Sequence, residues 1–148
     1  MTNGKCVFCD IVSEKEPATY IHREKDFLVF ENNLHWFPTQ LLLVPTVHMT
    51  QNELWDNEYL IMKISKYANN LGKKRCPNGY RILSNFGTDA MQTQSHAHVH
   101  VIGGVNLGLY MNGSPPIKTQ KYNWPPWNPV SVINQIYKFI IKNYNNSF

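Results

Sequence analysis

The sequence predicts an α+β fold, with an antiparallel sheet of about five strands and a long helix. Two observations lead to this prediction. Short segments rich in β-branched and aromatic residues are separated by turn-forming residues, as in antiparallel sheets. One longer segment, residues 52–71, places its apolar side chains at helical spacing. Because strands and helices do not alternate regularly, a parallel sheet is not expected.

The N-terminal part supplies the first predicted elements. Residues 6–13 form a turn or a short helix, and residues 19–23 and 26–31 form a hairpin around the polar turn Glu24-Lys25. The apolar run of residues 40–45 is predicted to be a buried strand that ends at its proline.

The long helix follows, and it is predicted to be continuous over residues 52–71. Thr50 and Asn52 are its candidate N-caps, and Gly72 is its candidate C-cap. A strand over residues 80–85 and a histidine-containing strand complete the sheet.

The chain changes character after a core of about residues 6–104. Residues 105–129 contain glycines and prolines that predict an irregular arm. Residues 130–145 have helical apolar spacing, which predicts a C-terminal helix packed on the same domain or on a second subunit. We expect residues 1–148 to form a single domain.

Composition and charge exclude several classes of function. The net charge of +4 is weak and dispersed, so it suits an anionic substrate such as a phosphate and does not indicate nucleic-acid binding. The apolar stretches are too short to span a bilayer and the N-terminus lacks an apolar signal segment, so we expect no membrane partner and a cytoplasmic protein. Three cysteines, an odd number, favour free thiols or a metal site over a disulfide framework.

Three histidines at two-residue spacing, His96, His98 and His100, are the strongest functional signal. In a strand their side chains share one face, ~7 Å apart, while Val99 and Val101 point into the core. Three interpretations stay open: incidental surface histidines, a multi-histidine metal centre, or separate tasks. In the last case one histidine is a nucleophile, one a phosphate donor and one a ligand or structural partner.

The cysteines give a second signal. Cys6 and Cys9 have the C-x-x-C spacing that lets two thiolates bind one metal, and the alternative is a pair of buried thiols. His48 and one member of the histidine row would complete a site of two cysteines and two histidines. Cys76 has no nearby cysteine and is expected to be free.

The loop of residues 85–95 lies directly before the histidines. It contains a glycine together with amide and hydroxyl side chains, which are neutral hydrogen-bond donors for phosphate oxygens. Turns favour the same residues, so the position of the loop beside the histidines is what suggests a phosphate site.

The segment His96–Ile102 fits the signature of the histidine-triad superfamily, three histidines alternating with apolar residues. Cys6–Ile11 resembles the opening of its nucleotide-binding branch, and Glu16–Ala18 falls where that branch has a similar tripeptide. Further stretches align in the same order: 30–32, 38–45 with His48, and 80–87. The resemblance covers residues 6–104, about two-thirds of the chain.

This resemblance implies an α+β fold, a homodimer and a nucleoside phosphate substrate. His98 would attack the α-phosphorus and form a nucleotidyl-histidine intermediate, which water or another acceptor resolves. The implied activity is that of a hydrolase or transferase acting on a nucleoside phosphoramidate or a related nucleotide. The alternatives are a dinucleoside polyphosphate hydrolase or phosphorylase, and a nucleotide-binding protein without catalysis.

The resemblance also implies roles for other side chains. The backbone carbonyl of His96 would orient the second ring nitrogen of His98. Phosphate oxygens would be bound by Asn85, Gln92, Thr93 and the second catalytic histidine, His100. The nucleoside would be contacted by Ile11, Phe30 and Asn32. One structural zinc ion per chain, with no open coordination position, would be held by Cys6, Cys9, His48 and His96.

Three departures from the family pattern limit what the resemblance implies. Asn32 stands where many relatives carry an aspartate that binds the ribose hydroxyls, and Gln40 replaces a common histidine. After Gly104 the chain no longer matches, although Trp124–Pro126 resembles a short tail that borders the partner's active site. The substrate range therefore does not follow from the resemblance.

Overall fold

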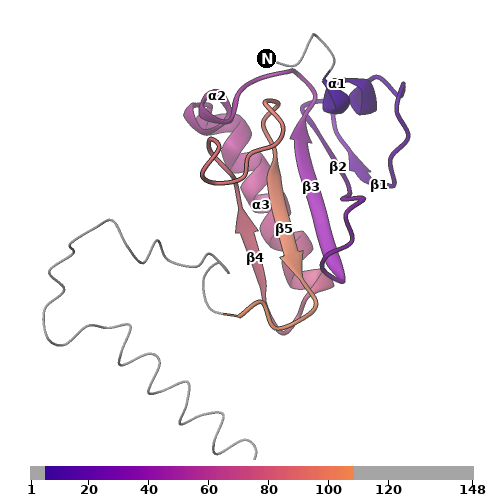
Figure 1. Ribbon diagram of the computed structural model, residues 1–148, viewed down its shortest axis with the longest axis vertical. Coiled ribbons are helices and arrows are strands. Elements are labelled where there is room, and N and C mark those ends of the chain that lie inside the picture. The colour runs from indigo at the N-terminus through magenta and orange to yellow at the C-terminus, as the bar shows by residue number, and fades with distance from the viewer. Residues whose placement is uncertain (1–5, 109–148) are drawn as a thin grey trace, which may run out of the picture. The chain divides into compact units, whose positions relative to one another are not determined.

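The computed structural model describes residues 6–108, which form one antiparallel sheet with three helices (Figure 1). The elements are α1 (Val7–Val12), β1 (Tyr20–Arg23), β2 (Phe27–Glu31), β3 (Thr39–Pro45), α2 (Gln51–Asp56), α3 (Glu58–Arg75), β4 (Tyr80–Leu83) and β5 (Val99–Gly103). The strand order is β1-β2-β3-β5-β4, with every neighbouring pair antiparallel. The predicted α+β fold with a five-stranded sheet and a long helix is confirmed.

Most of the predicted arm (105–129) and the whole predicted C-terminal helix (130–145) lie outside the described residues. The expectation of a single domain therefore stays a prediction. Within residues 6–108, no helix combines the length and the apolar character needed to cross a membrane.

The sheet carries a hydrophobic cluster on each of its faces. Along β2, Phe27 and Val29 point to the cluster that contains α3, whereas Leu28 and Phe30 point to the cluster that contains α1. We call these clusters the α3-side core and the α1-side core. Because both faces are covered, β2 and β3 are almost continuously apolar and do not alternate between apolar and polar residues.

The predicted helix over residues 52–71 is wrong in its continuity. The structure has two helices, and Asn57 separates them because its side-chain oxygen accepts a hydrogen bond from the Leu60 N–H at 3.0 Å and caps α3. Thr50, one of the two candidate N-caps, caps α2 in a capping box with Glu53. The helical spacing of apolar residues can continue across such a break, because it shows only which side of each helix faces the core.

Gly72 is not the predicted C-cap, because α3 continues to Arg75. A Cβ atom at Gly72 would collide with the ring of Tyr80, the first residue of β4. Glycine is needed at this position for close packing of the helix against the strand.

An ion cluster joins the β1–β2 turn to α3. The ammonium of Lys63 lies 2.7 Å from carboxylate oxygens of both Glu24 and Asp26. These hydrogen bonds from Lys63 hold the pKa values of both carboxyl groups below their usual range. A carboxyl group with a lowered folded-state pKa stabilises the fold above its ordinary pKa, and this stabilisation is lost as the pH falls through the lowered value.

Lys63→Met is therefore expected to lower the melting temperature at pH 7 by a few degrees. It should also reduce the further loss of stability that the wild type shows as the pH falls below the ordinary carboxyl values of 4.5 and 3.8. Thermal unfolding followed by circular dichroism at several pH values measures both effects. Lys66→Met, at an exposed lysine of the same helix, is the matched control. Equal acid sensitivity of the Lys63 variant and the wild type would contradict the prediction.

Candidate active site and metal centre

The histidine row lies where β5 begins. As predicted, Val99 and Val101 are buried in the α3-side core. The predicted extent of the strand is wrong at its start, because β5 covers Val99–Gly103 and both His96 and His98 precede it. Only His100 lies within the strand.

The row is deeply buried and is not an exposed row of surface histidines. His96 is 0% exposed and His98 is 4% exposed. Burial lowers the pKa of His96 to about 4 and that of His100 to about 4, and it also lowers the pKa of His98. Neutral imidazole, the form that can act as a nucleophile or bind a metal, is therefore the form present at neutral pH.

A backbone hydrogen bond orients the ring of His98. Its Nδ1 lies 2.9 Å from the carbonyl oxygen of His96, and only a protonated Nδ1 can donate to that oxygen. The proton on Nδ1 leaves the lone pair on Nε2, which has no hydrogen-bond partner among the described residues. This is the orientation that the resemblance implies for a nucleophile.

His100 has the one buried side-chain nitrogen or oxygen atom within residues 6–108 that lacks a hydrogen-bond partner, its Nε2. Its ring centroid lies 4.8 Å from that of His98. A buried polar group without a partner costs about 1–3 kcal/mol, so the site is suited to a ligand that supplies a partner there.

Cys6, Cys9, His48 and His96 form a cluster whose ligand atoms all lie within 4.8 Å of one another. The Sγ atom of Cys9 lies 3.3 Å from Nδ1 of His48 and 3.5 Å from Nδ1 of His96, and Sγ of Cys6 lies 3.5 Å from the latter nitrogen. Ordinary zinc–sulfur and zinc–nitrogen bonds at tetrahedral angles give a sulfur–nitrogen separation of about 3.6 Å. These three sulfur–nitrogen separations match that geometry, and the four residues together offer the two sulfur and two nitrogen ligands of a tetrahedral site.

The surroundings of the cluster also suit a metal. Nε2 of His96 lies 3.0 Å from the carbonyl oxygen of Pro45, which directs the lone pair of Nδ1 toward the cysteines. Burial, followed by the neighbouring Cys6, raises the pKa of the Cys9 thiol to about 11. A bound cation would reverse this effect, because it favours the thiolate.

Three segments that are distant in sequence supply these four ligands. Cys6 is the N-cap of α1 and Cys9 lies in its first turn, whereas His48 follows β3 and His96 precedes β5. A metal ion would therefore fasten the N-terminal helix to the segment that leads into β5.

The predicted phosphate-binding residues of the loop differ in their availability. The Gln92 amide is occupied within the loop, since its oxygen accepts from the Gly87 N–H at 2.8 Å and its nitrogen donates to the Gln94 carbonyl at 2.9 Å. Asn85 is half-buried and Thr93 is exposed, and neither side chain has a hydrogen-bond partner among the described residues. The structure leaves Asn85 and Thr93 free for a ligand, and engagement of Gln92 would require it to exchange partners.

Two of the three predicted nucleoside contacts, Ile11 and Phe30, lie in the same hydrophobic cluster, the α1-side core. Phe30 contacts the ring of Phe8, and that ring in turn contacts His98 at a centroid distance of 5.2 Å. Asn32, just beyond β2, accepts a hydrogen bond from the Leu34 N–H at 3.0 Å.

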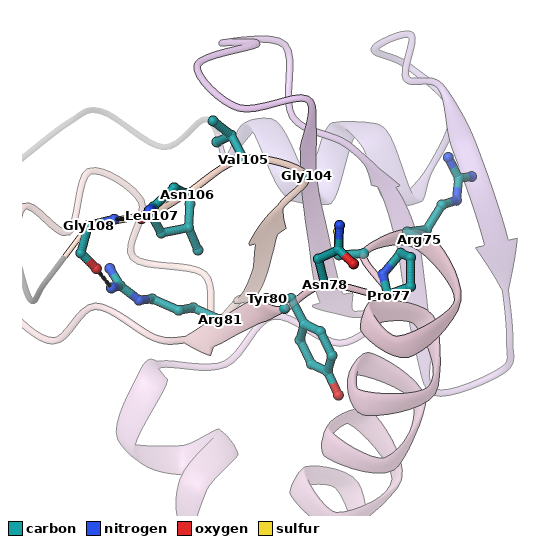
Figure 2. Close-up of a pocket in the computed structure, with 12 residues that line it drawn as sticks. Arg75, Pro77, Asn78, Tyr80, Arg81, Gly104, Val105, Asn106, Leu107 and Gly108 are labelled. Carbon is teal, nitrogen blue, oxygen red and sulfur yellow. Dashed lines mark hydrogen bonds between the residues drawn. The ribbon is translucent and has the colours of Figure 1, made fainter. Parts of the chain in front are cut away.

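A cavity of about 660 Å³ lies at the other end of β5, beyond Gly103. Figure 2 shows residues that line it. The cavity lies between the end of α3, the start of β4 and residues 104–108. The Arg81 guanidinium donates a hydrogen bond to the carbonyl oxygen of Gly108 at its edge. None of the residues predicted from the sequence as site residues lines this cavity.

Sequence reasoning missed two side chains that hold the backbone of His98. The Gln51 amide bonds both to its N–H and to its carbonyl oxygen, at 3.0 Å each, and the Ser84 hydroxyl lies 3.3 Å from the same carbonyl. A polar residue at the start of a helix gives no sequence signal of such a contact, because the contact joins segments 47 positions apart.

A buried row of histidines leads into β5 of an antiparallel sheet, and its first member, His96, joins two cysteines and His48 in one cluster. This arrangement defines a histidine-triad type of protein. The chain belongs to the HIT domain family, which matches residues 13–107.

Sequence and structure comparisons agree with this assignment. An uncharacterised HIT-like protein of Rickettsia prowazekii is 30% identical, over 76% of this chain and 98% of that protein. The structure of a HIT family hydrolase from Legionella pneumophila has a TM-score of 0.67 at 29% identity, over 72% of this chain and 98% of the other. A zinc-bound histidine triad family protein of Mycobacterium smegmatis has a TM-score of 0.62 at 25% identity, over 76% and 84% of the two chains.

Proposed function

We propose that this protein is a nucleotide hydrolase or transferase that attacks the α-phosphorus of a nucleoside phosphoramidate or related nucleotide through His98. The observation that carries the proposal is the hydrogen bond from Nδ1 of His98 to the His96 carbonyl, which leaves Nε2 as a free nucleophile. The similarity to the Legionella HIT family hydrolase supports the reaction class.

The proposed reaction has two steps. The Nε2 lone pair of His98 forms a bond to phosphorus, while the bond to the leaving group breaks and its electron pair departs with that group. A water molecule, or another acceptor, then attacks the same phosphorus and releases the imidazole, while the attacking oxygen loses its proton. Each step inverts the phosphorus, so the two together retain its configuration.

His100 is proposed to bind a phosphate oxygen in both steps. Its buried Nε2 has no partner among the described residues, and an N–H at this position would bond to the charge that grows on phosphate in the transition state. Asn85 and Thr93, whose side chains are free, and Gln92 would supply further donors. The contacts to the nucleoside are proposed for Ile11, Phe30 and Asn32.

The cluster of Cys6, Cys9, His48 and His96 is proposed to hold one structural zinc ion. A bound zinc ion would have four protein ligands and no open position for substrate, so its role would be to cross-link the fold. The zinc-bound relative from Mycobacterium smegmatis supports the choice of metal.

Turnover of a substrate panel tests the proposed function. Wild-type protein is expected to hydrolyse a nucleoside phosphoramidate faster than a dinucleoside polyphosphate, and intact-mass spectrometry of quenched reactions should show one nucleotidyl group per chain. Peptide mapping should place the group on His98. The opposite substrate preference would favour a dinucleoside polyphosphate hydrolase or phosphorylase, and binding without turnover of any substrate would favour a nucleotide-binding protein.

A homodimer is proposed as well, on the strength of the family resemblance. Light scattering on the chain of residues 1–148 should give about twice the 17.2 kDa of one chain. A mass close to that of one chain would contradict the dimer.

A further inference from the structure

Gln51 is a buried polar residue at the first position of α2, with an exposure of 3%. Its side chain makes two hydrogen bonds, and both go to the backbone of His98. The amide nitrogen donates to the His98 carbonyl at 3.0 Å, and the amide oxygen accepts from the His98 N–H at 3.0 Å.

This pair of bonds takes the place of backbone pairing with a neighbouring strand at His98. The ladder between β3 and β5 starts at Val99, so the backbone of His98 lies just outside it. The preceding N–H, of Ala97, donates to the carbonyl oxygen of Met49 at 2.8 Å. The Gln51 amide, which has the same donor and acceptor as a peptide group, continues this pairing by one residue, and a buried backbone group needs such a partner.

The backbone of His98 matters because it determines where the ring lies. The ring is held by the bond from its own Nδ1 to the carbonyl of His96, two residues earlier, so the bond depends on the backbone angles between these residues. A shift of about 1 Å in a reacting group can reduce a rate by about 100-fold.

We propose that Gln51 is a positioning residue for the nucleophile, which fixes the backbone of His98 so that Nε2 faces the substrate. The inference rests on the proposed function of His98. Ser84 assists, since its hydroxyl lies 3.3 Å from the same carbonyl, but only Gln51 bonds to both backbone groups. Gln51 itself does not touch the reacting atoms.

Two substitutions separate the two hydrogen bonds from the packing of the side chain. Gln51→Met keeps nearly the same volume and removes both bonds. Gln51→Glu keeps the acceptor for the His98 N–H and replaces the donor to the His98 carbonyl with a second oxygen. Asn57→Ala is the matched control, because it removes a side-chain bond to the backbone N–H of Leu60 from the neighbouring helix and leaves His98 untouched.

Steady-state kinetics with a nucleoside phosphoramidate tests the inference. Gln51→Met is expected to lower kcat by about 10- to 100-fold, with KM changed less than about threefold, because substrate contacts stay intact. The kcat of Gln51→Glu should lie between the kcat of Gln51→Met and that of the wild type. Asn57→Ala should lose thermal stability and keep its kcat. An unchanged kcat in both Gln51 variants, or a loss confined to KM, would overturn the proposal.

Nitrogen-15 NMR of the histidine rings and amide hydrogen exchange give a readout that does not depend on turnover. In wild-type protein the His98 ring should show the Nδ1–H tautomer, and its amide should be protected from exchange. In Gln51→Met the fraction of the Nδ1–H tautomer and the protection of the His98 amide should both decrease, and in Asn57→Ala both should stay as in the wild type. Persistence in the Gln51 variant would overturn the positioning role, even where His98 proves necessary for turnover. If turnover does not require His98, the proposed function fails, and the tautomer still shows whether Gln51 orients the ring.

Discussion

Replacement of His98 by alanine is expected to reduce turnover of a nucleoside phosphoramidate by about 10³-fold or more, because the substitution removes the proposed nucleophile. The nucleotidyl adduct should disappear from the mass spectrum at the same time. Substrate binding should weaken much less, since the groups proposed to bind phosphate are on other residues. The comparison of kcat with the dissociation constant of a non-hydrolysable analogue measures both effects.

Two other histidine variants serve as references for this result. His100→Ala is expected to lose about 10²-fold in kcat, as is typical when one donor to a developing negative charge is removed, and to keep the adduct. His22→Ala should retain activity, because His22 stacks on Tyr67 and binds Glu24 away from the histidine row. Normal turnover by the His98 variant would rule out the proposed mechanism.

The histidine row shows what the sequence can predict. Alternation along a strand is a local property, so the spacing placed Val99 and Val101 in the core correctly. The start of β5 was not predictable in the same way. His96 and His98 lie outside the strand because their backbones bond elsewhere, that of His98 to the side chains of Gln51 and Ser84.

The two wrong predictions for the helices, one continuous helix and a C-cap at Gly72, also arise because contacts between distant segments have no local sequence signal. Apolar spacing records the buried side of α2 and α3 together, and it carries no information on Asn57 as a cap between them. Gly72 is a typical helix terminator in sequence, and only the position of the Tyr80 ring explains why it lies inside α3. Contacts between residues distant in sequence decide these positions.

The metal cluster was more predictable from the sequence than the boundaries of the helices and of β5. The spacing of Cys6 and Cys9 indicates one pair of ligands, and His48 with one member of the histidine row was the candidate second pair. The family resemblance then selected His96 from the row. The structure brings all four ligand atoms within 4.8 Å. The carbonyl of Pro45 that orients His96 had no sequence signal, because its partner lies 51 positions away.

Cys9→Ser is expected to remove most of the bound zinc and to lower stability by about 4 kcal/mol, the contribution of a metal present at a thousand times its dissociation constant. For a chain of this size, this loss corresponds to a decrease of about 10 °C in melting temperature. Elemental analysis of purified protein should give about one zinc per wild-type chain. Thermal unfolding with and without a chelator measures the contribution of the metal.

Cys76→Ser separates the loss of the metal from the loss of a buried thiol. Cys76 is 3% exposed and lies outside the cluster, so its variant should keep its zinc and still respond to the chelator. The Cys9 variant should no longer respond, because its metal is already absent. Wild-type protein that binds no zinc, or whose melting temperature the chelator leaves unchanged after removing the metal, would contradict a structural zinc site. Since His96 belongs to the cluster and its carbonyl also orients His98, removal of zinc should lower kcat as well as stability.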